Sequence, residues 1–100
     1  MAVMPSMSWK GAGVRPRAAG ACAGTVEGYR WEAYLAREPV SYGLNPQTLY
    51  KGQGRIVRLE LLAPVAGRVW RRVAVYNRGW VFGRKAYLPV LARLVRELDG

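Results

Sequence analysis

The twelve residues 87–98 of this 100-residue chain carry the pattern that most limits its fold. Their apolar side chains recur at the three- and four-residue spacing of an amphipathic helix: Tyr87, Leu88, Leu91, Leu94, Val95 and Leu98. Pro89 is tolerated only in a first helical turn, so the helix should begin within residues 86–88. An apolar stripe of this kind packs onto a second layer of structure, which the preceding residues must therefore supply.

The preceding residues alternate between short apolar segments and turn signals. An acid-Gly pair, Glu27-Gly28, predicts a tight hairpin between residues 25–26 and 29–35. Further strands are predicted at 55–62 and 68–76, followed by a short apolar segment at 80–82. We therefore predict an α+β fold, with a small antiparallel sheet of about four strands packed by one C-terminal helix. Residues 24–100 should form this single domain, and residues 1–23 a flexible N-terminal arm.

Alternation within a strand predicts which side chains share a face of the sheet. In residues 29–35 one face carries Tyr29, Trp31, Ala33 and Leu35. In residues 55–62, Ile56 is expected on the same face as Arg58, and Val57 on the other. After Arg68, which begins the predicted strand 68–76, each face carries one arginine, so alternation leaves the buried side of that strand open.

Two connecting segments offer side chains for recognition. Residues 39–53 form a long loop, whose start either presents Tyr42 to a partner or is a rigid exit from the strand. The sequence Tyr-Asn-Arg-Gly-Trp at 76–80 favours a turn in which Asn77 and Gly79 take positive φ and both aromatic rings enter the core. Alternatively, one of these rings would stack on a nucleobase beside Arg78.

Basic side chains are concentrated in residues 51–85. The chain has a formal net charge of +10, and this window holds nine lysines and arginines against a single acid, Glu60. The charge therefore belongs to one structural element, the basic hairpin of residues 51–85. A cationic element of this kind indicates a polyanion or an acidic protein surface as the partner.

Several function classes are disfavoured by the composition. Histidine is absent and cysteine occurs once, which leaves too few ligands for zinc or iron and no base to activate a serine. Glu32 and Glu60 would fall on neighbouring strands, but each has an arginine nearby to pair with. We expect no enzymatic activity, no cofactor and no metal. The absence of a long apolar run and of a secretory leader pattern predicts a cytoplasmic protein without a membrane span.

Three motifs resemble a small domain of unknown function that is common in phages and prophages. They are Glu38-Pro39-x-Ser41-Tyr42-Gly43, Gly54-Arg55-Ile56-x-Arg58-Leu59 and Tyr76-Asn77-Arg78-Gly79-Trp80. The resemblance covers roughly residues 24–98 and implies the same order of hairpin, loop, strand pair, turn and closing helix. It also implies a phage or mobile-element origin, with the host cytoplasm as the location, and it indicates no site.

Our leading hypothesis is a small basic binding protein that contacts nucleic acid or a nucleoprotein through a cationic β-hairpin. A phage-encoded inhibitor of host defence that docks on a protein complex is an alternative, and a structural or scaffolding phage protein is another. The candidate binding residues are Arg55, Arg58, Arg68, Arg71, Arg72, Arg78, Arg84, Lys85 and Tyr42.

Overall fold

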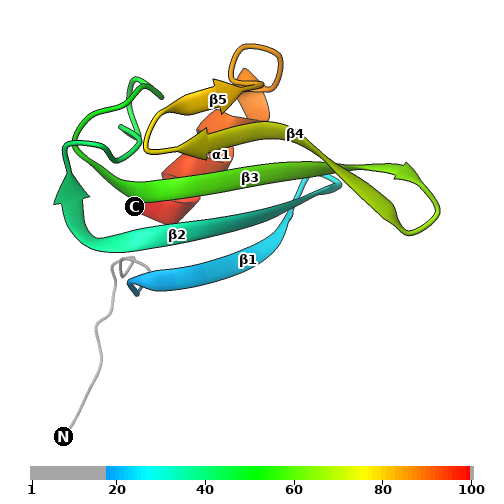
Figure 1. Cartoon of the computed structure of the whole chain (residues 1–100), viewed down its shortest axis with the longest axis horizontal. Coiled ribbons are helices and arrows are strands. Elements are labelled where there is room, and N and C mark those ends of the chain that lie inside the picture. Colours follow the sequence, from blue (N-terminus) through cyan, green and yellow to red (C-terminus); the bar gives the residue numbers. More distant parts are fainter. Residues whose placement is uncertain (1–17, 100) are drawn as a thin grey trace, which may run out of the picture.

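The computed structural model describes residues 18–99 and consists of one antiparallel sheet with a helix packed on one of its faces (Figure 1). The strands lie in chain order, so that each pairs with the next. The elements are β1 (Gly20–Val26), β2 (Tyr29–Val40), β3 (Gly54–Ala66), β4 (Val69–Asn77), β5 (Trp80–Phe82) and α1 (Leu88–Asp99). The predicted α+β class is confirmed, whereas the predicted strand number is wrong, because the sheet has five strands. The short apolar segment at 80–82 is the fifth, and Trp80 pairs with Tyr76 of β4.

The folded part of the chain begins earlier than the sequence suggested. β1 starts at Gly20, inside the segment that we assigned to a flexible arm. Its small residues pair along β2 from Gly20 opposite Leu35 to Val26 opposite Tyr29. The predicted arm otherwise falls largely on residues 1–17, which lie outside the described residues.

The turn between β1 and β2 has the predicted two-residue form. Glu27 and Gly28 both adopt positive φ, at 50° and 86°, and Val26 and Tyr29 are paired directly before and after them. Two consecutive positive φ angles are typical of the type I′ turn, whose twist matches that of the flanking strands. The first hairpin was therefore readable from its acid-Gly pair.

The core lies between α1 and the inner face of β2, β3 and β4. Trp31, Ala33 and Leu35 share one face of β2, as their alternation predicted, and this face is the buried one. Trp31 is paired with Leu61 of β3, and Ala33 with Leu59, so the buried rows of the two strands coincide. The stripe of α1 closes this layer through Val90, Leu91, Leu94, Val95 and Leu98, all buried. Burial of each such side chain stabilises the fold by about 1.5–3 kcal/mol, which explains why one helix of twelve residues is enough to order the sheet.

A β-bulge in β3 changes which side chains face the core. Tyr34 pairs with Arg58, but its neighbour Leu35 pairs with Ile56, which leaves Val57 as an extra residue. Alternation is therefore reset between Ile56 and Arg58. Ile56 is fully buried, so the prediction that it shares a face with Arg58 is wrong. A single inserted residue of this kind cannot be recognised from the alternation of side chains along the sequence.

β3 and β4 extend beyond the rest of the sheet as a two-stranded ribbon (Figure 1). The last pair between β2 and β3 joins Arg30 to Leu62, whereas β3 and β4 remain paired as far as Ala66 and Val69. We call residues 63–71 the ribbon. No other strand of the described chain pairs with it, and its side chains at Val65 and Val69 are well exposed.

The long loop after β2 is anchored to the core. Leu44 and Leu49 are buried, and the side chain of Asn45 accepts hydrogen bonds from the backbone N–H groups of Gln47 (2.8 Å) and Thr48 (3.1 Å). Two backbones meet closely at its base, where a Cβ atom on Gly43 would overlap the carbonyl oxygen of Gly54. The loop is therefore part of the packed domain.

Within residues 18–99, no helix combines the length and the apolar character that a membrane crossing requires.

Candidate functional site

One face of the sheet is covered by α1 and the other is uncovered in the described part of the chain (Figure 1). We call the uncovered side the open face. On β2 it carries Arg30, Glu32 and Tyr34, which alternate with the buried residues. The register places Arg58 of β3 directly opposite Tyr34, and Glu60 opposite Glu32. The open face thus carries polar and aromatic side chains at positions where a covered face would carry apolar ones.

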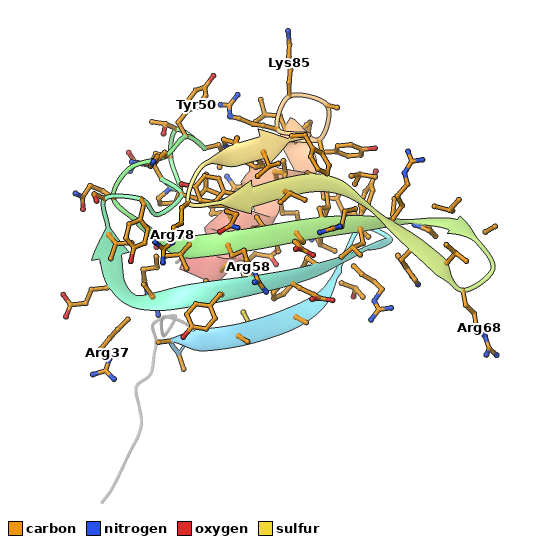
Figure 2. The ribbon with its side chains drawn as sticks, in the orientation of Figure 1. Arg37, Tyr50, Arg58, Arg68, Arg78 and Lys85 are labelled. Atoms are coloured by element: carbon orange, nitrogen blue, oxygen red, sulfur yellow. The ribbon has the colours of Figure 1, made fainter. Side chains whose placement is uncertain are left out.

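A shallow depression lies at one end of the open face. It has a volume of about 260 Å³ and is lined by Tyr34, Val57, Arg58, Asn77 and Arg78. We call it the arginine depression. Two of its lining residues are among the sequence-predicted site residues, Arg58 and Arg78, and they come from β3 and from the turn after β4. Figure 2 shows both on the face of the sheet that is turned towards the reader. None of its lining residues is acidic.

Arg78 is held in place from two sides. Its backbone N–H donates a hydrogen bond to the carbonyl of Val57 (3.0 Å), the extra residue of the bulge. Its guanidinium carbon lies 4.8 Å from the centre of the Tyr42 ring, a cation–π contact that contributes about 0.5–1 kcal/mol at an exposed site. The carbonyl of Tyr42 in turn accepts a hydrogen bond from the hydroxyl of Tyr76 (2.9 Å). Tyr42, which we predicted as a partner-binding residue, therefore lies beneath Arg78 and supports it.

The two arginines of the depression are not held in ion pairs. Among residues 18–99, neither Arg58 nor Arg78 forms an ion pair. Tyr34 lies beside Arg58 and is 49% exposed, so its ring is accessible to solvent. The arrangement places two arginine side chains and one aromatic ring around a single hollow. Guanidinium groups present paired N–H donors that match phosphate or carboxylate oxygens.

Two other predicted site residues have structural roles. Arg55 is buried, its Nε donates to the carbonyl of Ala36 (3.0 Å), and its backbone N–H donates to the Asp99 carboxylate (3.0 Å). Arg84 donates through Nε to the carbonyl of Leu49 (2.8 Å), and its guanidinium carbon lies 3.6 Å from the centre of the Tyr50 ring. The expectation that Arg55 lies on a binding surface is corrected, because its guanidinium instead ties β3 to the end of β2.

The remaining predicted cations point in several directions (Figure 2). Arg68 lies at the tip of the ribbon, and Lys85 projects from the top of the molecule in this view, between β5 and α1. Arg71 is exposed on the ribbon, and Arg72 pairs with Glu60 across 3.7 Å. The structure therefore divides the predicted cationic hairpin into separate groups, and it joins Arg58 and Arg78 in one of them.

Acidic side chains occupy the centre of the open face. Glu32 and Glu60 are directly opposite each other on β2 and β3. Glu32 also lines a second depression, of about 310 Å³, together with small residues of β1 and Arg58. Positive charge on the open face is therefore interrupted between the arginine depression and the ribbon.

In the turn at 76–80 both aromatic rings pack inward as predicted, but the backbone conformation differs from the predicted one. Tyr76 is fully buried, Trp80 is half-buried, and their rings meet edge to face at 5.3 Å between centroids. Burial raises the pKa of the Tyr76 hydroxyl, which keeps it protonated as the donor to the Tyr42 carbonyl. Positive φ was expected at Asn77 and Gly79, but Arg78 adopts it (58°) together with Gly79. Arg78 thus combines a left-handed backbone with a side chain that lines the arginine depression.

Tyr34 is a lining residue that the sequence-based list of site residues does not contain. Its outward orientation follows from the buried residues on either side of it, and Arg58 is brought next to it by the register between β2 and β3. The usable signal was an aromatic ring on the polar face of a strand. Its proximity to Arg78 could not be derived, because that depends on the bulge at Val57.

Among the described residues, no group of three or more His, Cys, Asp or Glu side chains could hold a metal ion. Comparisons with protein-family models, with curated proteins and with solved structures give no match to this chain. The resemblance to a phage domain stays an expectation from three sequence motifs. The functional interpretation therefore rests on the geometry of the open face.

Proposed function

We propose that this protein binds the phosphate backbone of nucleic acid through the open face of its sheet, without enzymatic activity. The single observation that carries the proposal is the convergence of Arg58 and Arg78 on one hollow that contains no acidic group. Their donors are free of ion pairs within the described chain, so an incoming anion has no internal carboxylate to displace.

The net charge extends the attraction beyond the arginine depression. With a formal charge of +10, the whole molecule attracts a polyanion at a distance, and the exposed cations at Arg37, Arg68 and Lys85 add to this field. Phosphates recur along a nucleic acid, so cations at several places on one protein can each meet one. An isolated small anion would be bound by the arginine depression alone and would not contact the other cations.

Phosphate contacts place a protein on its ligand without reading sequence. We therefore propose largely sequence-independent binding, with an affinity that falls as salt rises. For a single strand, log K should fall by about 0.7 per phosphate contact for each unit of log salt concentration.

The test is a fluorescence anisotropy titration of labelled oligonucleotides between about 50 mM and 200 mM salt. The variant R58Q/R78N removes both cations of the depression, and Asn at position 78 tolerates the left-handed backbone found there. The matched control K85Q/R96Q removes two exposed cations that lie outside the depression. We expect R58Q/R78N to weaken binding about tenfold or more and to make the salt slope shallower by roughly 1.4.

The control variant should change affinity by about threefold or less, through the general field alone. Binding that is absent in the wild-type protein, that does not respond to salt, or that falls equally in both variants would contradict the proposal.

A protein-directed inhibitor is a second candidate, and β5 provides the observation in its favour. Val81 and Phe82 are 60% and 48% exposed on the short edge strand of the sheet. Exposed apolar side chains beside a basic surface suit an acidic protein partner. Capture of a host protein that persists after nuclease treatment, together with loss of capture in V81T/F82T, would favour this function over the first.

A further inference from the structure

We propose that the ligand of the arginine depression is a flexible single strand, bound with one base stacked on Tyr34 and its flanking phosphates on Arg58 and Arg78. This inference rests on the function proposed above and specifies the class of nucleic acid. It commits to a single strand because the three side chains offer two different kinds of contact within one hollow.

Tyr34 is suited to stacking because its backbone is fixed and its ring is accessible. It lies within β2, which is paired on both sides, with Ala21 of β1 and Arg58 of β3 as its direct partners. The alanine is too small to cover the ring, and the side chain stays 49% exposed. A rigid aromatic side chain of this kind loses little conformational entropy when a base lies against it.

The other accessible aromatic rings of the described chain are less suitable. The Tyr42 and Tyr50 rings are each occupied by a guanidinium, from Arg78 and Arg84 respectively. Phe82 is 48% exposed but does not line the arginine depression. Tyr34 is therefore the exposed ring of the described chain that lies in one hollow with two arginines that form no ion pair.

Duplex nucleic acid does not fit this geometry. In a duplex the flat faces of the bases are stacked on one another, and only their edges are accessible in the grooves. The depression lies on the open face of a sheet, and the element that projects from the molecule is the ribbon, which carries Arg68. A ring that lies on a sheet face reaches the face of a base only when that base is already unstacked.

The acidic pair limits the path of the strand. Glu32 and Glu60 lie further along β2 and β3, on the side of Tyr34 and Arg58 that leads towards the ribbon. Arg72 pairs with Glu60, so Glu32 supplies the main repulsion of phosphates in this part of the face. A bound strand should therefore cross the sheet from Arg58 towards Arg78. This path limits the footprint to about one stacked base and its neighbouring phosphates.

The experiment compares affinities for single-stranded DNA, single-stranded RNA and a duplex of the same sequence. The variant Y34T removes the ring and retains a residue that favours strands. Y34F retains the ring, and F82T removes a similarly exposed ring elsewhere on the sheet. Thermal unfolding of each variant verifies that the fold is retained.

We expect the wild-type protein to prefer both single strands to the duplex. Y34T should lose about fivefold to 150-fold in affinity for the single strands, as removal of one stacking ring does. Y34F and F82T should remain close to wild type. The ratio of DNA to RNA affinity reports on the sugar, and either single strand supports the inference.

Ultraviolet cross-linking gives a second readout that needs no variant. Trypsin cleaves after Arg30 and Arg37, so an adduct on Tyr34 appears in the peptide of residues 31–37. The other aromatic residue of this peptide, Trp31, is 5% exposed and belongs to the core under α1. A cross-link to a brominated single strand in this peptide supports stacking, and cross-links confined to other peptides overturn it.

The two proposals fail in different ways. Equal affinity for single strand and duplex, with Y34T unchanged, overturns the stacking inference and leaves phosphate binding in place. Salt-insensitive or absent binding to every oligonucleotide overturns both.

Discussion

The ribbon and the arginine depression each present two exposed arginines, and they differ in what holds those side chains. Arg68 and Arg71 lie on a pair of strands that no third strand of the described chain flanks. Arg58 lies on a central strand, and Arg78 is fixed by a backbone hydrogen bond and by the Tyr42 ring. The ribbon and the depression thus carry the same number of arginines, but only those of the depression are held in a defined position before a ligand binds.

This contrast shows that charge density along a sequence does not by itself define a binding site. A side chain that is already held in its bound geometry loses less entropy when the ligand arrives. A cation at the end of a ribbon contributes mainly to long-range attraction, which salt screens within about 8–10 Å at physiological ionic strength. We therefore expect the depression to determine affinity and the ribbon to assist encounter.

The largest expected effect concerns the loop that supports the depression. Gly43→Ala should destabilise the protein by about 3 kcal/mol, because the added Cβ overlaps the carbonyl of Gly54 and pushes the two backbones apart. Gly67→Ala in the turn of the ribbon has open space around it, and it should lose only about 1 kcal/mol, from the left-handed φ of 54°. Urea denaturation monitored by tryptophan fluorescence measures both. Equal losses would mean that the loop and the ribbon are equally ordered.

An intermediate effect is expected when the ribbon loses its charges. Arg68→Gln combined with Arg71→Gln should weaken oligonucleotide binding by about threefold, whereas the same number of charges removed from the depression should weaken it about tenfold or more. Anisotropy titrations at one salt concentration compare the two directly. If the ribbon variant loses more affinity than R58Q/R78N, the principal contact is at the hairpin tip.

The smallest expected effect is a gain. Glu32→Gln removes a negative charge from the second depression, next to Arg58, and should increase affinity by about twofold at low salt. The gain should vanish at high salt, because the charge is exposed and screened. Glu97→Gln on the outer side of α1 removes the same charge far from the open face and serves as the control. An unchanged or lower affinity in Glu32→Gln would contradict the view that the charge of Glu32 repels a bound phosphate backbone.

The elements with strong local signals were predictable from the sequence. The apolar spacing of residues 87–98 gave α1, and Glu27-Gly28 gave the first turn, because both depend on neighbours close in the chain. The fifth strand was not recognised, since three residues at 80–82 are too few to show alternation and are defined by their pairing with β4.

The site was only half predictable, for a physical reason that Val57 illustrates. This extra residue resets the alternation of β3, so that Ile56 enters the core while Arg58 faces outward beside Tyr34. The burial of Arg55 has a similar origin, because its partners are a carbonyl at residue 36 and a carboxylate at residue 99. Contacts between residues so distant in the chain are set by the tertiary fold.

The left-handed backbone at Arg78 has a consequence for how this surface could change through mutation. An L-residue with a side chain in this conformation is less stable than glycine by about 1–2 kcal/mol, so replacement by glycine should make the domain more robust to heat. A single base change converts many arginine codons to glycine codons, so this route is open to ordinary mutation. A lineage selected for thermal tolerance alone would tend to give up the cation here, and one that keeps it is under a selective demand other than folding.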